Sequence, residues 1–277
     1  MSSSKYSVYR RFGRRLVGGW LAPEVLEVLA VLDNAQAARG VRGSVAEIGV
    51  HHGKLLIALD LLRNDGETSV AIDLFDDQTQ NVDKSGKGDL SVFRRNLARW
   101  SKVDSLAVHA GDSTKLSSQA LSELANGKIR LFSVDGGHDE PVVFSDLQLA
   151  ETVLVPGGII VADDVFHQEW PGVMTGLIRY LNQDPRLVPF AIGFNKVFLT
   201  TPESVEDYRA AVDFAFSDRY LTSVKASEFF GNPVSVVARV RRTPRLILRR
   251  NKTLRRAYGR IRDLRDSEAN TLAAQRV

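Results

Sequence analysis

Short apolar runs alternate with helix-like stretches between residues 44 and 162, and this rhythm constrains the fold more than any other feature of the sequence. Strands that alternate with helices of 10–15 residues predict a parallel sheet, because parallel neighbours need a long crossover connection. Runs that are apolar throughout predict strands buried on both faces of that sheet. The runs are Ser44–Ile48, Ser69–Ile72, Leu106–His109, Ile129–Val134 and Gly158–Ala162, and the helical stretches lie near 53–63, 88–100, 116–126 and 141–154. The expected fold class is therefore α/β, with helices on both faces of the sheet.

The sequence on either side of this region predicts further helices and strands, and it divides the chain into a leader, a main domain and a tail. A helix is expected to begin near Pro23, a favoured first-turn residue, within a basic leader or cap over residues 1–40. After residue 170 we expect a helix, an antiparallel hairpin at one edge of the sheet, a second helix and a last apolar run. They span Val173–Asn182, Leu187–Gly193 with Lys196–Thr201, Pro202–Phe216 and Ser235–Val240. The main domain is expected over 41–238 and a basic C-terminal tail over 239–277.

The basic charge of the chain is confined to its tail. The formal net charge is +4, but residues 239–277 contribute 13 Lys/Arg and 3 Asp/Glu, which leaves −6 for residues 1–238. Nucleic acid is therefore not the expected partner of the main domain, whereas the Arg-rich tail remains open to RNA, to anionic lipid or to an acidic protein surface. No stretch of about 20 apolar residues predicts a membrane span. The chain has no cysteine, which excludes disulfides, zinc–thiolate sites and thiol catalysis, and we expect a cytoplasmic protein.

Acidic residues and glycines lie at the carboxyl ends of the first three expected strands. Ligands of an open α/β sheet bind outside the carboxyl ends of its strands, and an acid after the second strand is placed to accept bonds from ribose hydroxyls. The glycines allow a sharp turn and a close approach of the backbone. These residues are Glu47, Gly49 and Gly53 in an E-x-G-x-x-x-G motif, then Asp73, then Asp112 with Ser113. A third dinucleotide-loop glycine is missing, which argues against the rival hypothesis of an NAD-dependent oxidoreductase.

The fourth and fifth strands end in acids that predict a cation site. Asp135 follows the fourth strand, and Asp163 and Asp164 follow the fifth. Three converging carboxylates repel one another unless a cation lies among them, and oxygen ligands favour a hard cation such as Mg²⁺, Mn²⁺ or Ca²⁺. His138 lies three residues after Asp135 and is the expected general base, with His167 as the second choice.

This series of motifs resembles that of the class I S-adenosylmethionine-dependent methyltransferases. The resemblance covers about residues 41–201 and is carried by Glu47–Gly49, Asp73, Gly111–Ser113 and Pro156–Gly158. Asp135, His138 and the Asp163–Asp164 pair narrow it to the metal-dependent O-methyltransferases, including the macrocin-type sugar enzymes. Catechol-type enzymes have a similar layout, with lysine in the place of His138 and asparagine in the place of Asp164.

The resemblance implies a Rossmann-like seven-stranded sheet and a role for each motif residue. It implies that Glu47, Gly49 and Gly53 contact the methionine part of S-adenosylmethionine and that Asp73 holds its ribose. Asp112 and Ser113 would lie beside the adenine, and Asp135 would border the cofactor. Mg²⁺ would be held by Asp135, Asp163 and Asp164, with His138 as the base.

The expected function is methylation of a hydroxyl on a sugar or glycan, whether a glycoside, a polysaccharide or a natural-product sugar. The alternatives are a catechol-type acceptor and an RNA-binding methyltransferase that uses the basic tail. We also expect a homo-oligomer. Leu74–Asp89 is interpreted either as a lid over the site or as a surface loop, and Phe166 and Trp170 either as aromatic rings that stack on a sugar or as core residues.

Overall fold

The computed structural model describes residues 4–77, 79, 86–101, 105–217 and 221–240, together with residues 253, 256 and 259. The chain divides into two compact units. One comprises Met1–Asp218 with Val224–Ala238, and the other comprises Arg219–Ser223 with Arg239–Val277. Every site residue expected from the sequence lies in the first unit. The expectations for the Arg-rich tail fall almost wholly outside the described residues.

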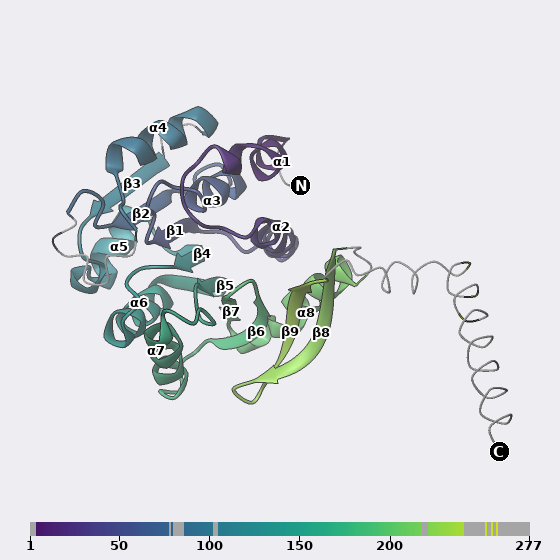
Figure 1. Cartoon of the computed structure of the whole chain (residues 1–277). Coiled ribbons are helices and arrows are strands. Elements are labelled where there is room, and N and C mark those ends of the chain that lie inside the picture. Colours follow the sequence, from purple (N-terminus) through teal and green to yellow (C-terminus); the bar gives the residue numbers. More distant parts are fainter. Residues whose placement is uncertain are drawn as a thin grey trace, which may run out of the picture. The chain divides into compact units, whose positions relative to one another are not determined.

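Nine strands among the described residues form one sheet in the order β3-β2-β1-β4-β5-β7-β6-β9-β8 (Figure 1). Neighbouring strands from β3 to β5 run parallel, β7 is antiparallel to both β5 and β6, and β9 is parallel to β6. The strands are β1 Ser44–Ile48, β2 Ser69–Asp73, β3 Leu106–Ala110, β4 Ile129–Val134, β5 Leu154–Ala162, β6 Val188–Gly193, β7 Lys196–Thr200, β8 Thr222–Phe229 and β9 Asn232–Arg239.

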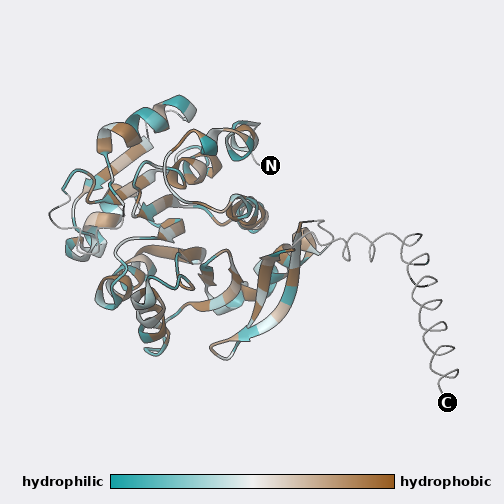
Figure 2. Ribbon diagram, in the orientation of Figure 1, coloured by the Kyte–Doolittle hydropathy of each residue, from teal (hydrophilic) through white to brown (hydrophobic). Residues whose placement is uncertain are grey.

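Helices cover both faces of the sheet (Figures 1 and 2). The sheet divides the hydrophobic core into two apolar layers, one on each face. Successive side chains of a strand point to opposite faces, so Val45 of β1 belongs to one layer and Ala46 to the other. The helices that contribute side chains to the first layer are α1 Ser4–Arg11, α2 Pro23–Ala38, α3 Leu56–Leu62, α4 Leu90–Trp100 and α8 Val205–Phe216. The second receives α5 Ser118–Leu124, α6 Glu140–Val153 and α7 Pro171–Leu181. No helix in the described part of the chain is both long and apolar enough to cross a membrane.

The N-terminal segment is anchored to the rest of the first unit by two buried tyrosines of α1. The Tyr6 hydroxyl donates to the Leu26 carbonyl of α2 at 2.6 Å, and the Tyr9 hydroxyl donates to the Lys54 carbonyl at 2.7 Å. The Lys54 ammonium in turn donates to the carbonyl of Gly19. These bonds place the N-terminal segment against the loop that follows β1.

The α/β class expected from the sequence is confirmed, and three of its details differ. The sheet has nine strands in the described residues instead of seven, because β8 and β9 extend it. The β6–β7 hairpin therefore lies inside the sheet and not at its edge. The helix expected over 53–63 begins only at Leu56, because Gly53 has a φ of +87° and belongs to the preceding turn.

Arg130, near the start of β4, organises the amino end of the parallel strands. Its side chain is 1% exposed and lies among acceptors from three segments of the chain. Nη1 donates to Gln36 at 2.7 Å and lies 2.9 Å from Asp33, Nε lies 3.2 Å from Glu67, and Nη2 donates to the Leu62 carbonyl at 2.8 Å. Each nitrogen of the guanidinium group thus has a partner, as a buried charge requires.

Candidate functional site

The strand order reverses between β1 and β4, which is where an open α/β sheet forms its ligand crevice. Gly49 directly follows β1 at this point and has a φ of +86°. A Cβ added there would lie 1.7 Å from the Asp135 carbonyl oxygen, so only glycine fits. At Gly53 an added Cβ would lie 2.5 Å from the Phe93 ring. Both glycines therefore meet packing requirements of the chain itself, and their contact with a cofactor stays a prediction.

Asp73 joins the end of β2 to the loop that follows β1. Its Oδ2 accepts from the backbone N–H of His51 at 2.7 Å, and its Oδ1 accepts from that of Phe75 at 2.5 Å. Gly88, at the end of the 74–89 loop, approaches so closely that an added Cβ would lie 2.7 Å from the same Oδ1. Residues 78 and 80–85 of that loop lie outside the described residues, so its role as a lid stays a prediction.

Asp112 caps the short 3₁₀ turn Ser113–Lys115 after β3. Its Oδ1 accepts from the Thr114 backbone N–H at 3.0 Å and from the Thr114 hydroxyl, and its Oδ2 pairs with Lys115 at 3.0 Å. Burial alone would raise the pKa of Asp112, but these bonds lower it overall. The carboxylate thus remains ionised at the edge of the sheet, and its position beside an adenine stays a prediction.

Glu47 of β1 is a deeply buried acid, only 2% exposed. Burial raises its pKa well above the ordinary value, Asp135 raises it further, and Lys196 opposes the shift. Its Oε2 has no hydrogen-bond partner among the described residues. A buried carboxyl oxygen without a partner is costly, so Glu47 offers an acceptor to a ligand at this point.

Asp135, His138 and Asp164 come together at the ends of β4 and β5. Each offers one atom suited to a metal, and these atoms all lie within 4.8 Å of one another. His138 Nε2 is 3.8 Å from Asp164 Oδ2. Asp164 has a left-handed backbone with a φ of +51°, an uncommon conformation for a non-glycine residue, as often occurs at functional sites. Two of the three expected metal ligands, Asp135 and Asp164, thus lie close together with the expected base His138.

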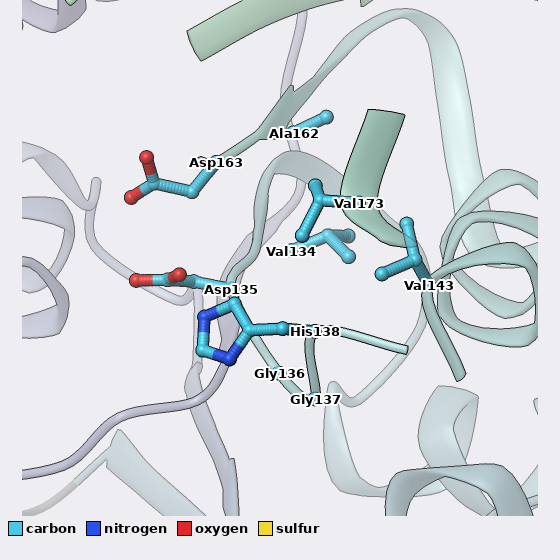
Figure 3. A pocket seen from close by; sticks show the side chains of 9 residues that line it. All are labelled: Val134, Asp135, Gly136, Gly137, His138, Val143, Ala162, Asp163 and Val173. Atoms are coloured by element: carbon cyan, nitrogen blue, oxygen red, sulfur yellow. The ribbon is translucent and has the colours of Figure 1, made fainter. Parts of the chain in front are cut away.

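A small pocket, partly open to solvent, lies between the same strand ends (Figure 3). Its inner part is apolar, lined by Val134, Ala162 and neighbouring valines of α6 and α7. Figure 3 shows the carboxylates of Asp135 and Asp163 pointing to the same side, with the His138 ring beside Asp135. Burial raises the pKa of Asp135 to about 7, although Lys196 lowers it.

Asp163 is engaged differently from the other three residues. Its Oδ1 accepts from the Asp164 backbone N–H at 2.7 Å, and its Oδ2 forms an ion pair with the Lys196 ammonium. Both of its oxygens therefore have partners within the chain. Its expected role as a metal ligand stays a prediction.

Sequence reasoning missed Lys196, the first residue of β7, which is 3% exposed. The register of β5 and β7 pairs Ala162 with Val197, so the next position places Lys196 opposite Asp163. Burial lowers the pKa of Lys196, and the carboxylates of Asp135 and Glu47 oppose that shift. The sequence did offer one signal for Lys196, because it is a lysine at the start of a strand expected to run antiparallel beside the strand-end acids.

Two aromatic residues near the cation cluster have defined contacts. Trp170 stacks on His138, with ring centroids 4.3 Å apart and planes 17° apart. Phe166 is 43% exposed and meets Phe229 edge-on at 6.2 Å. His167 lies 6.4 Å from the Trp170 ring, beyond the stack. Trp170 therefore helps to orient the His138 imidazole, whereas the Phe166 ring remains partly exposed to solvent.

Asp146 of α6 is a second residue that sequence reasoning missed. It is 1% exposed, and an added Cβ at Gly136 would lie 2.7 Å from its Oδ2. Burial raises its pKa to about 7. Nothing in the sequence separates this residue from an acid on a solvent-exposed helix face, because its burial arises from the packing of α6 under the loop after β4.

Comparison with known proteins identifies the part of the chain that carries this site. Residues 46–165 match a family model described as a methyltransferase domain. No curated protein matches the sequence of the chain. Among solved structures, the O-methyltransferase NovP has a TM-score of 0.51 and 14% sequence identity, and the match covers 64% of this chain and 80% of NovP.

A second solved structure has the same fold. It is that of CalS11, described as a TDP-rhamnose 3′-O-methyltransferase of calicheamicin biosynthesis, with a TM-score of 0.50 and 18% identity over 70% of this chain and 86% of CalS11. The matched residues 46–165 run from β1 to just past the Asp163–Asp164 pair. They contain the expected cofactor and metal residues and the expected base His138, whereas the second-choice base His167 lies outside the match. The comparisons thus show a methyltransferase-domain match over residues 46–165 and a fold similar to that of solved O-methyltransferases.

Proposed function

We propose that the protein is an O-methyltransferase that transfers the methyl group of S-adenosylmethionine to a hydroxyl of a sugar or glycan with the help of Mg²⁺ or a similar divalent cation. The observation that carries this proposal is the convergence of Asp135, His138 and Asp164 within 4.8 Å. A sugar hydroxyl is a poor nucleophile near neutral pH, so its methylation benefits from a cation and a base. An amine acceptor would not need this arrangement.

The residues present fit a hard divalent cation. Mg²⁺ takes oxygen ligands and is often held by only one or two protein carboxylates, with water or substrate oxygens in the other positions. Asp135 and Asp164 would hold it, and burial of Asp135 beside another acid favours a cation there because like charges repel. Bound in this place, the ion would stabilise the negative charge that develops on the acceptor oxygen.

His138 is the group that would accept the proton of the acceptor hydroxyl. Its ring is fixed by the stack on Trp170 and by its position beside Asp164, so one orientation of the imidazole is maintained. When bound, S-adenosylmethionine would supply the methyl group, and the His138 imidazole would take the proton that the acceptor hydroxyl gives up. Glu47, Asp73 and Asp112 would bind the cofactor along the ends of β1, β2 and β3.

A sugar acceptor is supported by the exposed ring of Phe166, two residues after Asp164, because an accessible aromatic ring can pack on the apolar face of a sugar. The described activity of CalS11 gives the first substrate class to try, a nucleotide-linked deoxysugar. We also propose that the enzyme is a homo-oligomer. The catechol-type alternative is the direct competitor for the same cation site.

The test combines cofactor binding with product analysis. We expect calorimetry to show S-adenosylhomocysteine binding with and without EDTA, because the cofactor acids lie on different strands from the cation cluster. Mass spectrometry should find methylated TDP-rhamnose or a related sugar only when Mg²⁺ is present. Asp164→Asn should abolish this product, whereas Asp184→Asn, at an exposed position, should not.

Two results would contradict the proposal. Undiminished transfer after exhaustive EDTA treatment would remove the metal from the mechanism. Methylation of a catechol, with none of any sugar in the panel, would favour the alternative acceptor.

A further inference from the structure

Lys196 brings a fixed positive charge to the edge of the proposed cation site. Its ammonium is buried against Asp163 Oδ2, while Asp163 Oδ1 is occupied by the Asp164 backbone N–H. Burying an ammonium without a partner is costly, so the pair forms a stable internal contact. Asp163 thus has no oxygen available for a cation unless it leaves Lys196.

Asp135 and Asp164 are not bound in this way. Both offer an oxygen to the cluster within 4.8 Å of the His138 imidazole, and Asp163 is absent from that cluster. Lys196 also acts on Asp135 and Glu47, since each of these carboxylates opposes the effect of burial on the lysine. A single ammonium therefore lies among acids from β1, β4 and β5, and any divalent cation bound by Asp135 is repelled by it.

We propose that Lys196 holds Asp163 outside the coordination of the cation and keeps the affinity of the site for divalent ions low. This inference rests on the proposed function, because it concerns the same cation site. Lys196 is a positioning residue in this role, since it acts through Asp163 and through its charge. Replacing the lysine with an uncharged side chain would free a third carboxylate and remove the repulsion. The variant would then bind the cation more tightly than the natural protein, which is the opposite of what loss of a merely structural residue would do.

The experiment measures Mn²⁺ binding to the metal-stripped full-length protein by electron paramagnetic resonance of the free ion. We expect Lys196→Met to bind Mn²⁺ roughly 10-fold or more tightly than the wild type, because one carboxylate is gained and one nearby positive charge is lost. Lys128→Met is the matched control, because Lys128 is exposed and donates to the Thr152 carbonyl, outside the cation site. The double variant Lys196→Met/Asp163→Asn restores the net charge and should return the affinity to near the wild-type value.

Thermal unfolding gives a second readout that does not involve turnover. Without metal, Lys196→Met leaves Asp163 buried without its cation, so the melting temperature should fall. Added Mn²⁺ should restore much more of that loss in Lys196→Met than it adds to the wild type, because ion binding stabilises the folded state according to its affinity.

Asp163→Asn keeps the inference testable if Lys196→Met does not fold. We expect this variant to lose much less Mn²⁺ affinity than Asp164→Asn, whereas equal losses would show that Asp163 is a ligand and would overturn the inference. Wild-type binding of Mn²⁺ together with unchanged or weaker binding by folded Lys196→Met would also overturn it and leave the proposed function intact. Absence of Mn²⁺ binding by both proteins would instead remove the metal from the proposed function, and the inference with it.

Discussion

In the part of the chain that the structure describes, each end of the parallel strands buries one long cationic side chain. The two cations differ in how well their charges are matched by neighbouring acceptors. Arg130 at the amino end has an acceptor for every guanidinium nitrogen, with two acids, a glutamine and a carbonyl around it. Lys196 at the carboxyl end has a single ammonium facing an excess of acids. Those acids are Glu47, Asp135 and Asp163.

The difference shows which end is built for stability and which for ligands. At the amino end the Arg130 charge is satisfied by acceptors within the chain. The carboxyl end keeps unbalanced negative charge and a buried Glu47 oxygen without a partner among the described residues. Such an arrangement costs free energy in the folded state and is compensated when a cofactor or cation supplies the missing partner.

The largest expected effect concerns turnover at the carboxyl end. His138→Gln should lower turnover by roughly 10²- to 10⁴-fold, the usual contribution of a positioned general base. The affinity for S-adenosylhomocysteine and the unfolding free energy should stay close to the wild-type values, because the imidazole faces the acceptor side of the site. His167→Gln is the matched control and should keep near-normal rates. Near-normal turnover by His138→Gln would show that His138 only positions the acceptor.

At the amino end the expected effect is on stability instead of rate. Arg130→Met leaves Asp33 and Glu67 buried without their cation, so the free energy of unfolding in urea should fall by roughly 3–5 kcal/mol. Arg42→Met, at an exposed position, should change it little. Turnover per folded molecule should be unaffected. If Arg130→Met instead lowered turnover while the protein remained as stable as the wild type, the assignment of the two ends would be wrong.

A smaller effect is expected from Asp146, below the loop that follows β4. Burial raises its pKa from 3.8 to about 7, so the folded protein retains a proton that the unfolded chain has already lost between those values. The resulting stability is fully present below about pH 4 and is lost as pH rises through 7. Asp146→Asn cannot ionise, so it should match the wild type at pH 4 and exceed it by roughly 1–3 kcal/mol at pH 8. Urea unfolding of the metal-free proteins at both pH values measures this, and parallel pH profiles would contradict it.

The sequence predicted the elements whose signal is local. β1 and β4 begin and end where their apolar runs do, because these strands are buried on both faces. β8 escaped prediction because Lys225 and Glu228 lie exposed along it, which resembles a loop more than a strand. The sequence did not predict α1 as a separate helix within the leader. Its buried residues Tyr6 and Tyr9 are held by carbonyls far along the chain, and a local pattern does not reveal such contacts.

The same distinction separates the parts of the site. The strand-end acids could be found because parallel strands bring their carboxyl ends to one edge of the sheet. Lys196 depends on the antiparallel register of β5 and β7, which the sequence does not fix. The burial of Asp146 depends in the same way on the packing of α6 against Gly136.

The contact between Gly49 and Asp135 has a consequence for how the two halves of the site communicate. The loop after β1 and the loop after β4 meet main chain to main chain, with no space for even a methyl group. A shift of either loop therefore displaces the other directly, since no flexible side chain lies between them to absorb it. In the function that we propose, occupancy of the cofactor half and occupancy of the cation half would therefore be linked through this contact. Because such linkage is reciprocal, whichever ligand arrives first changes the affinity for the second by the same factor that the second would change the first.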